Sequence, residues 1–252
     1  MHHPIELVRV NSLDQVKLLT ALGSKTWIND PVFELFCPDR HKSPKNYHQL
    51  WRIILKDEFS QPGTVIIAAC KDGSKDMRNA VGFAVWRRHG KGDIARSWRS
   101  DSLGKSKILL KADHYLWRCK SDMRRQTELS RLAAILELVY CIILGRLPLV
   151  GLIDLLLAHR NVEKLYPEER WRLSYLGVSP DSQNCGVGKT LLQWGIERSE
   201  EEEAPAVLES SKPGRALYEK MGFRVIGWQK INGGKLQHPA MLREARGHKK
   251  LV

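Results

Sequence analysis

The sequence predicts an α/β protein with a mixed β-sheet, and three observations support this fold class. Thr64–Cys70 is rich in β-branched residues and predicts a buried strand, which Ala80–Trp86 extends into a hairpin. In the second half of the chain, a strand, a glycine-bearing loop and a helix follow one another over Trp171–Ser199. The chain has 252 residues and 42% hydrophobic content, which is enough for one large domain over residues 1–252.

The first ninety residues predict alternating strands and helices. Asn11 or Ser12 can cap the first helix, and Leu50 and Ile53 belong to an apolar stripe on the second. The segment Asn29–Pro38 contains two prolines and predicts turns. The expected elements are a strand at Ile5–Val10, helices at Leu13–Leu22 and Tyr47–Phe59, and strands at Thr64–Cys70 and Ala80–Trp86.

The last eighty residues predict the rest of the sheet. Gly222 stands where it can end a short helix before the final strands. The expected elements are strands at Trp171–Val178 and Ala206–Ser210, helices at Gly188–Ser199 and Arg215–Lys220, and closing strands at Phe223–Trp228 and Gln237–Arg243.

Between these two parts, Ile94–Glu169 predicts a helical insertion. Its first part is basic, with ten Lys or Arg residues from Arg96 to Arg131, and its second part, Leu132–Leu157, is apolar. Because charged residues and a proline interrupt the apolar part, a pair of buried helices explains it better than a membrane span. The interrupting residues are Glu137, Arg146, Pro148 and Asp154.

The charge and cysteine content limit the partners and the compartment. A net charge of +13 favours an anionic partner, which leaves nucleic acid, a membrane surface, an acidic protein and a polyphosphate cofactor open. The five cysteines are scattered, which argues against a disulfide framework or a zinc site and for a reducing compartment. The start of the chain, Met1–Pro4, shows no signal-peptide pattern, so we expect a cytoplasmic protein.

The loop Gln183–Thr190 lies between a predicted strand and a predicted helix, a geometry that suits phosphate. Gly186 and Gly188 let the backbone approach an anion, and the loop ends in a lysine and a threonine. A P-loop ends similarly, but Gln183 stands where its first glycine belongs. With only about sixty residues left for a nucleotide-hydrolase sheet, we disfavour the P-loop.

The sequence resembles the GNAT superfamily of acetyl-CoA-dependent N-acetyltransferases. Gln183–Gly188 matches the family pattern [Q/R]-x-x-G-x-[G/A], and Leu217–Phe223 matches a second signature, Leu-Tyr-x-x-x-Gly-Phe. The likeness is close over Trp171–Trp228 and weaker over Ile5–Arg88, where Val81–Trp86 is similar to the third strand of the family. The arrangement is similar to fungal and bacterial members that modify small molecules.

The resemblance implies that acetyl-CoA is the cofactor and that an amine attacks its acetyl group directly, with no metal. The pantetheine arm would lie between the strands Leu173–Val178 and Ala206–Ser210, with main-chain groups of the first strand holding the arm and the loop holding the pyrophosphate. The implied cofactor-binding residues are Leu176, Gly177, Val178, Gln183, Asn184, Cys185, Gly186, Val187, Gly188, Lys189, Thr190 and Tyr218.

The resemblance also implies catalytic residues. Tyr218 matches the position whose phenol protonates the leaving thiolate, although a tyrosine that only packs on the sheet is an alternative. Many members carry a glutamate on the first of the two strands, and this chain has none there. Glu209 on the second strand is the nearest candidate base; a purely structural carboxylate, with ordered water relaying the proton, is the alternative.

The acceptor is expected to be an amine of a small molecule. In relatives, the region that holds Asp30, Phe33 and Phe36 walls the acceptor pocket, so these residues are candidate substrate-binding residues. A protein or peptide acceptor and a catalytically idle CoA-binding module remain alternatives. We expect no nucleic-acid or membrane partner, and we expect the insertion 94–169 to be a lid over the acceptor side.

Overall fold

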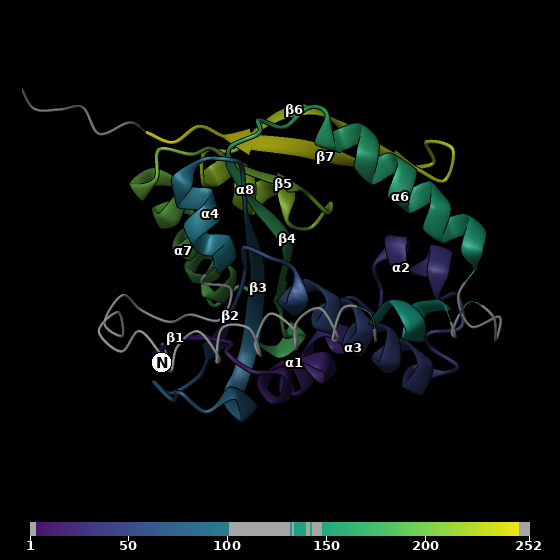
Figure 1. The fold of residues 1–252 in the computed structure, drawn as a ribbon. Helices are drawn as coiled ribbons and strands as arrows, with labels where there is room; N and C mark the ends of the chain where they lie inside the picture. Colours follow the sequence, from purple (N-terminus) through teal and green to yellow (C-terminus); the bar gives the residue numbers. More distant parts are fainter. Residues whose placement is uncertain (1–3, 101–131, 133, 140–141, 143–147, 247–252) are drawn as a thin grey trace, which may run out of the picture.

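A seven-stranded mixed sheet forms the centre of the computed structural model, which describes residues 4–100, 132, 134–139, 142 and 148–246 (Figure 1). The strand order is β1-β2-β3-β4-β5-β7-β6, and only β4 and β5 pair in parallel. The strands are β1 Glu6–Arg9, β2 Thr64–Cys70, β3 Ala80–His89, β4 Arg170–Val178, β5 Ala206–Glu209, β6 Arg224–Ile231 and β7 Leu236–Arg243. The helices are α1 Leu13–Thr26, α2 Pro31–Phe36, α3 Pro44–Ser60, α4 Asp93–Ser100, α6 Leu149–Glu163, α7 Val187–Glu201 and α8 Arg215–Lys220.

Each face of the sheet carries its own hydrophobic core, because side chains alternate along a strand. On β2, Ile66 and Ala68 face the core under α1 and α3, where Trp51 is fully buried. Val65 and Ile67 face the opposite core under α7 and α8. The predicted mixed α/β fold class is confirmed, and every predicted strand is present within a few residues of its expected bounds.

The segment between α1 and α3 differs from the prediction, because it contains a helix where turns were expected. Asp30 caps α2, its carboxylate accepting the Val32 N–H at 2.9 Å, and Pro31 occupies the first turn. Asp and Pro are as typical of a helix start as of a turn. The six residues of α2 are too few for a periodic pattern to distinguish the two.

The described parts of the insertion lie on two different faces of the sheet. Trp98 of α4 packs edge-on against Trp171 of β4, with 5.0 Å between ring centroids, on the α7 side. On the other side, α6 contacts β6 and α2, and Glu137 pairs with Arg52 of α3 at 2.7 Å. The basic segment 101–131 lies outside the described residues.

Of the buried helical pair expected at Leu132–Leu157, the helices are present in the described residues, but the expected burial is wrong. Val150 is 80% exposed, and within α6 only Ala158 and Val162 are buried. The helix contacts the rest of the fold along one side, so Leu149, Val150, Ile153 and Leu157 on its other side are exposed. No helix in the described part of the chain has the length and hydropathy that a bilayer span requires.

Candidate functional site

Strands β4 and β5 separate in the middle of the sheet. Their parallel pairing runs from Trp171 opposite Ala206 to Leu173 opposite Leu208 and then stops, although β4 continues to Val178. On its other edge, β4 stays paired with β3 through a bulge at Ser174. The β5-facing edge of β4 therefore has no strand partner after Leu173, and its backbone groups are available to a ligand.

Gly177 lets the outer end of β4 sit close to α1. A Cβ atom at this position would lie 2.3 Å from the Trp27 ring, closer than real Cβ contacts. A larger residue would push β4 and α1 apart. The predicted cofactor residues Leu176, Gly177 and Val178 thus lie on the part of β4 that pairs with β3 but not with β5.

The predicted phosphate loop follows β4 and leads into α7. Gly186 is the N-cap of α7 with φ +83°, and a Cβ atom placed there would meet nothing within 4 Å. Behind the loop, the Gln183 amide donates to the Val178 carbonyl at 3.3 Å. The first N–H groups of a helix have no partner within it, and the helix dipole makes this end positive. An exposed loop with an open backbone and free N–H groups fits a pyrophosphate.

Tyr218 of α8 lies on the α7 face of the sheet. Its ring packs edge-on against Phe223 at 6.0 Å and belongs to the same core as Leu173 and Leu208, the last paired residues of β4 and β5. Burial raises the pKa of Tyr218, so its hydroxyl stays protonated at neutral pH. Within the described residues, this hydroxyl makes no hydrogen bond to the protein.

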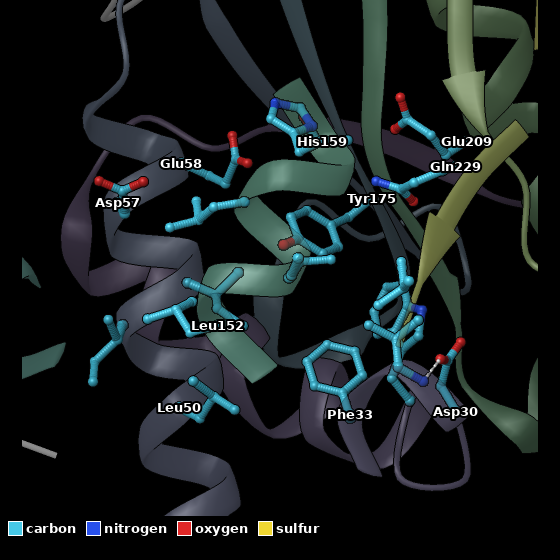
Figure 2. Close-up of a pocket in the computed structure, with 18 of the residues that line it drawn as sticks. Asp30, Phe33, Leu50, Asp57, Glu58, Leu152, His159, Tyr175, Glu209 and Gln229 are labelled. Atoms are coloured by element: carbon cyan, nitrogen blue, oxygen red, sulfur yellow. Dashed lines mark hydrogen bonds between the residues drawn. The ribbon is translucent and has the colours of Figure 1, made fainter. Parts of the chain in front are cut away.

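On the opposite face, a cavity of about 650 Å³ lies among α3, α6, β4 and the β6–β7 hairpin (Figure 2). Ser174 and Glu209 line it, so the cavity reaches the place where β4 and β5 separate. Asp30 and Phe33, two of the predicted substrate-binding residues, line it as well. The side chain of Phe36 lies outside the described part of the structure.

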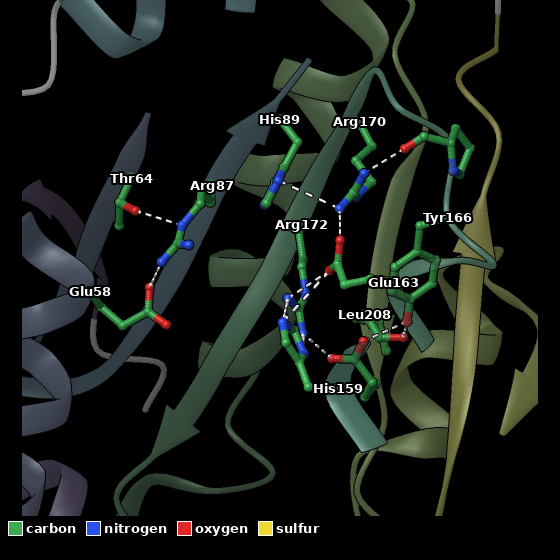
Figure 3. A network of polar contacts seen from close by, with 12 residues as sticks. Glu58, Thr64, Arg87, His89, His159, Glu163, Tyr166, Arg170, Arg172 and Leu208 are labelled. Carbon is green, nitrogen blue, oxygen red and sulfur yellow. Dashed lines mark hydrogen bonds and ion pairs between the residues drawn. The ribbon is translucent and has the colours of Figure 1, made fainter. Parts of the chain in front are cut away.

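A polar network lies at the β4–β5 gap (Figure 3), and Arg172, His159 and Glu209 of this network line the cavity. Arg172 of β4 pairs with Glu209 of β5 at 2.7 Å and with Glu163 of α6 at 2.9 Å. The other oxygen of Glu209 accepts the Tyr166 hydroxyl at 2.7 Å. Glu209 is therefore where the sequence placed a candidate base, and each of its carboxylate oxygens already accepts one hydrogen bond.

Two histidines that sequence reasoning did not select line the same cavity. Both ring nitrogens of His159 lie 3.0 Å from the Arg172 guanidinium, and burial together with Arg172 lowers the pKa of His159. Burial also lowers the pKa of His238, which lies opposite Gln229 in the β6–β7 hairpin. Both imidazoles are thus neutral at pH 7. They come from segments far apart in the chain, so no local spacing indicates them.

Comparison with known proteins agrees with this arrangement. Residues 110–223 match the family model described as the acetyltransferase (GNAT) family. A structure described as histone acetyltransferase HPA2 and related acetyltransferase, from Corynebacterium glutamicum, is 17% identical, with a TM-score of 0.54 over 97% of both chains. The protein PH1933 from Pyrococcus horikoshii is 12% identical, with a TM-score of 0.51 over 96% of this chain and 98% of that one.

A third structure, the PaiA N-acetyltransferase of Thermoplasma acidophilum in complex with coenzyme A, is 12% identical over 96% of this chain and 99% of that chain, with a TM-score of 0.45. The family match supports an acyltransferase, and the separated parallel strands are consistent with it. The match over residues 110–223 identifies a GNAT acetyltransferase domain in this chain, and that family uses acetyl-CoA.

Proposed function

We propose that the protein transfers the acetyl group of acetyl-CoA to an amine of a small molecule bound in the cavity. The observation that supports this is the position of α6, which packs on β6 and α2 and walls the cavity beside the β4–β5 gap. A cavity of about 650 Å³ is within the range of small-molecule sites. A peptide acceptor needs an open path across the same region.

The proposed cofactor site has two parts. Main-chain groups of Leu176, Gly177 and Val178 would hold the pantetheine arm along the unpaired edge of β4, and the loop Gln183–Thr190 would hold the pyrophosphate. In that loop the Thr190 hydroxyl already bonds to the Gly186 carbonyl at 3.2 Å. Gln183, Asn184, Cys185 and Lys189 are exposed and free to approach the cofactor.

Residues on both faces of the sheet carry the proposed chemistry. The cofactor supplies an activated acetyl thioester, whose acetyl carbon forms a C–N bond with the amine as the C–S bond breaks. Tyr218, protonated and buried on the α7 face, donates its hydroxyl proton to the sulfur. Glu209 lies on the cavity face and takes a proton from the ammonium form of the acceptor, directly or through water, so that the neutral amine can attack. The second N–H proton, lost as the amide forms, replaces the one that Tyr218 gives to the sulfur.

The insertion contributes to this site by closing it. We infer that 94–169 belongs to a single domain over residues 1–252 and that its second half, with α6, acts as the lid. Leu152, Leu155 and His159 of α6 all line the cavity. By contrast, α4 packs on the opposite face, away from the cavity.

The test is thiol release from acetyl-CoA with two matched panels, one of small primary amines and one of peptides with free N-terminal or lysine amines. Higher kcat/KM for small amines supports the proposal. Higher kcat/KM for peptides would replace it with a protein acetyltransferase. CoA binding in calorimetry without thiol release for any acceptor would indicate an idle CoA-binding module.

A further inference from the structure

The cavity has an apolar end and a polar end. On both α3 and α6, the side chains that line it are apolar first and polar further along the helix. On α3, Leu50, Ile53 and Ile54 face the cavity, and one to two turns later Asp57 and Glu58 do so. On α6, three leucines at positions 152, 155 and 156 are followed one turn later by His159. Figure 2 shows Leu50 and Leu152 at one end and Asp57, Glu58 and His159 at the other.

The polar end adjoins the β4–β5 gap and carries excess negative charge. Of its carboxylates, Glu58 pairs with Arg87 at 2.5 Å and Glu209 pairs with Arg172 at 2.7 Å. Asp57 accepts the Gln61 amide at 3.2 Å and has no cationic partner among the described residues. Three carboxylates against two guanidiniums favour a positively charged group at this end.

The opposite end is apolar over most of its lining. Ile53 and Ile54 of α3 face Leu152 and Leu155 of α6, and Ala134, Ile135 and Leu138 complete this part of the wall. Asp30 lies beside Phe33 on the α2 side of this end, where its carboxylate caps α2 (Figure 2). A second charge held between the α3 and α6 side chains would lose its hydration without a polar partner among them.

We propose that the acceptor is an amphipathic primary amine, whose ammonium group enters the polar end and whose apolar chain fills the end formed by α3 and α6. This rests on the proposed transfer to a small-molecule amine and specifies the class of that amine. The insertion is then the part of the fold that selects the acceptor. A compact hydrophilic amine would leave the apolar walls of α3 and α6 facing water.

The experiment compares 1-aminoalkanes from three to ten carbons at saturating acetyl-CoA. Each methylene buried on binding contributes about fourfold in affinity, so we expect kcat/KM to rise steeply with length and to level off when the cavity is full. The matched control is 1,8-diaminooctane, which has the length of 1-aminooctane but a second ammonium. We expect its kcat/KM to be at least 100-fold lower.

Two α6 variants test where the chain lies. Leu155→Trp fills the apolar end and should move the preferred length to shorter amines, whereas Val150→Trp, on the exposed side of the same helix, should leave it unchanged. Thermal melts show whether each variant is folded. A third variant, Leu152→Ser, removes apolar surface from the cavity wall and should make kcat/KM depend less on amine length.

The outcomes separate the two proposals. Equal kcat/KM across all lengths, or equal use of the diamine, overturns the amphipathic acceptor while leaving the small-molecule function intact. Failure of every small amine together with efficient acetylation of peptides overturns the proposed function itself.

Discussion

Arg172 and Glu209 lie on adjacent strands, and their side chains meet at 2.7 Å next to the last paired residues, Leu173 and Leu208. Both side chains are about 10% exposed, so the pair is shielded from solvent and bridges the point where β4 and β5 separate. The same carboxylate lines the cavity that we propose for the acceptor. Glu209 therefore links β4 to β5 beside the gap and also places a negative charge in the wall of the cavity.

The first prediction follows from this dual position. Glu209→Gln keeps the size of the side chain but removes the charge that balances Arg172, which then has Glu163 as its one anionic partner within the described part of the chain. We expect the free energy of unfolding to fall by about 1–3 kcal/mol and kcat to fall by roughly 10²-fold. Glu219→Gln, at an exposed pair with Arg215, is the control. Lower stability with normal kcat would assign Glu209 a purely structural role.

The second prediction concerns the phosphate loop. Gly186→Asp should abolish CoA binding in calorimetry, because the substitution puts a side chain and a negative charge where an anion is proposed to bind. Gly234→Asp is a matched control: Gly234 also has a positive φ and open space around its Cβ position, but it lies in the β6–β7 turn. If both variants bind CoA as the wild type does, the loop is not the pyrophosphate site.

The third prediction concerns the proton donor. Tyr218→Phe preserves the packing against Phe223 but removes the hydroxyl, so kcat should fall by roughly 10²-fold while the Kd for CoA stays the same. Tyr47→Phe removes another buried hydroxyl, one that bonds to the Trp27 carbonyl at 2.8 Å, and controls for general destabilisation. Wild-type turnover in Tyr218→Phe would show that the ring only packs.

The fourth prediction concerns acid stability. Burial and neighbouring arginines, Arg170 first among them, lower the pKa of His89 from its usual 6.5 to about 3. The unfolded chain thus binds a proton below pH 6.5 that the folded chain does not, and stability is lost as pH falls from 6.5 towards 3. By pH 5.5 the loss should be about 1 kcal/mol. Denaturant melts of His89→Gln should show a shallower loss over this range; an unchanged slope would contradict the assignment.

The sequence predicts the central elements well where the local composition decides the structure. Thr64–Cys70 forms β2 with the expected bounds, because a β-branched run fits only a buried strand. The helix Arg215–Lys220 also has its expected bounds, with Gly222 following at φ +88°. Side chains that interact only through the fold, such as His159 and Arg172, could not be paired from the sequence.

The cavity proposed for the acceptor also could not be predicted from the sequence, because its walls come from distant segments of the chain. The spacing of Leu50, Ile53 and Ile54 on α3, followed by Asp57 and Glu58, is visible in the sequence and indicates a helix face that changes from apolar to acidic. It does not show which element lies opposite that face. Arg172 was a further signal, because a charged residue in a buried strand needs a partner. Only the fold identifies Glu163 and Glu209 as its partners.

The short parallel contact between β4 and β5 divides the sheet into two parts that share few backbone hydrogen bonds. One part contains strands β1 to β4 and the other contains β5, β7 and β6. In the described structure, the two parts are paired through three residue pairs between β4 and β5. A ligand that lies between β4 and β5 beyond their last paired residues would contact both parts and stabilise their association. The amide hydrogens of β5 should then exchange with solvent more slowly when CoA is present than in its absence, while those of β2 stay unchanged.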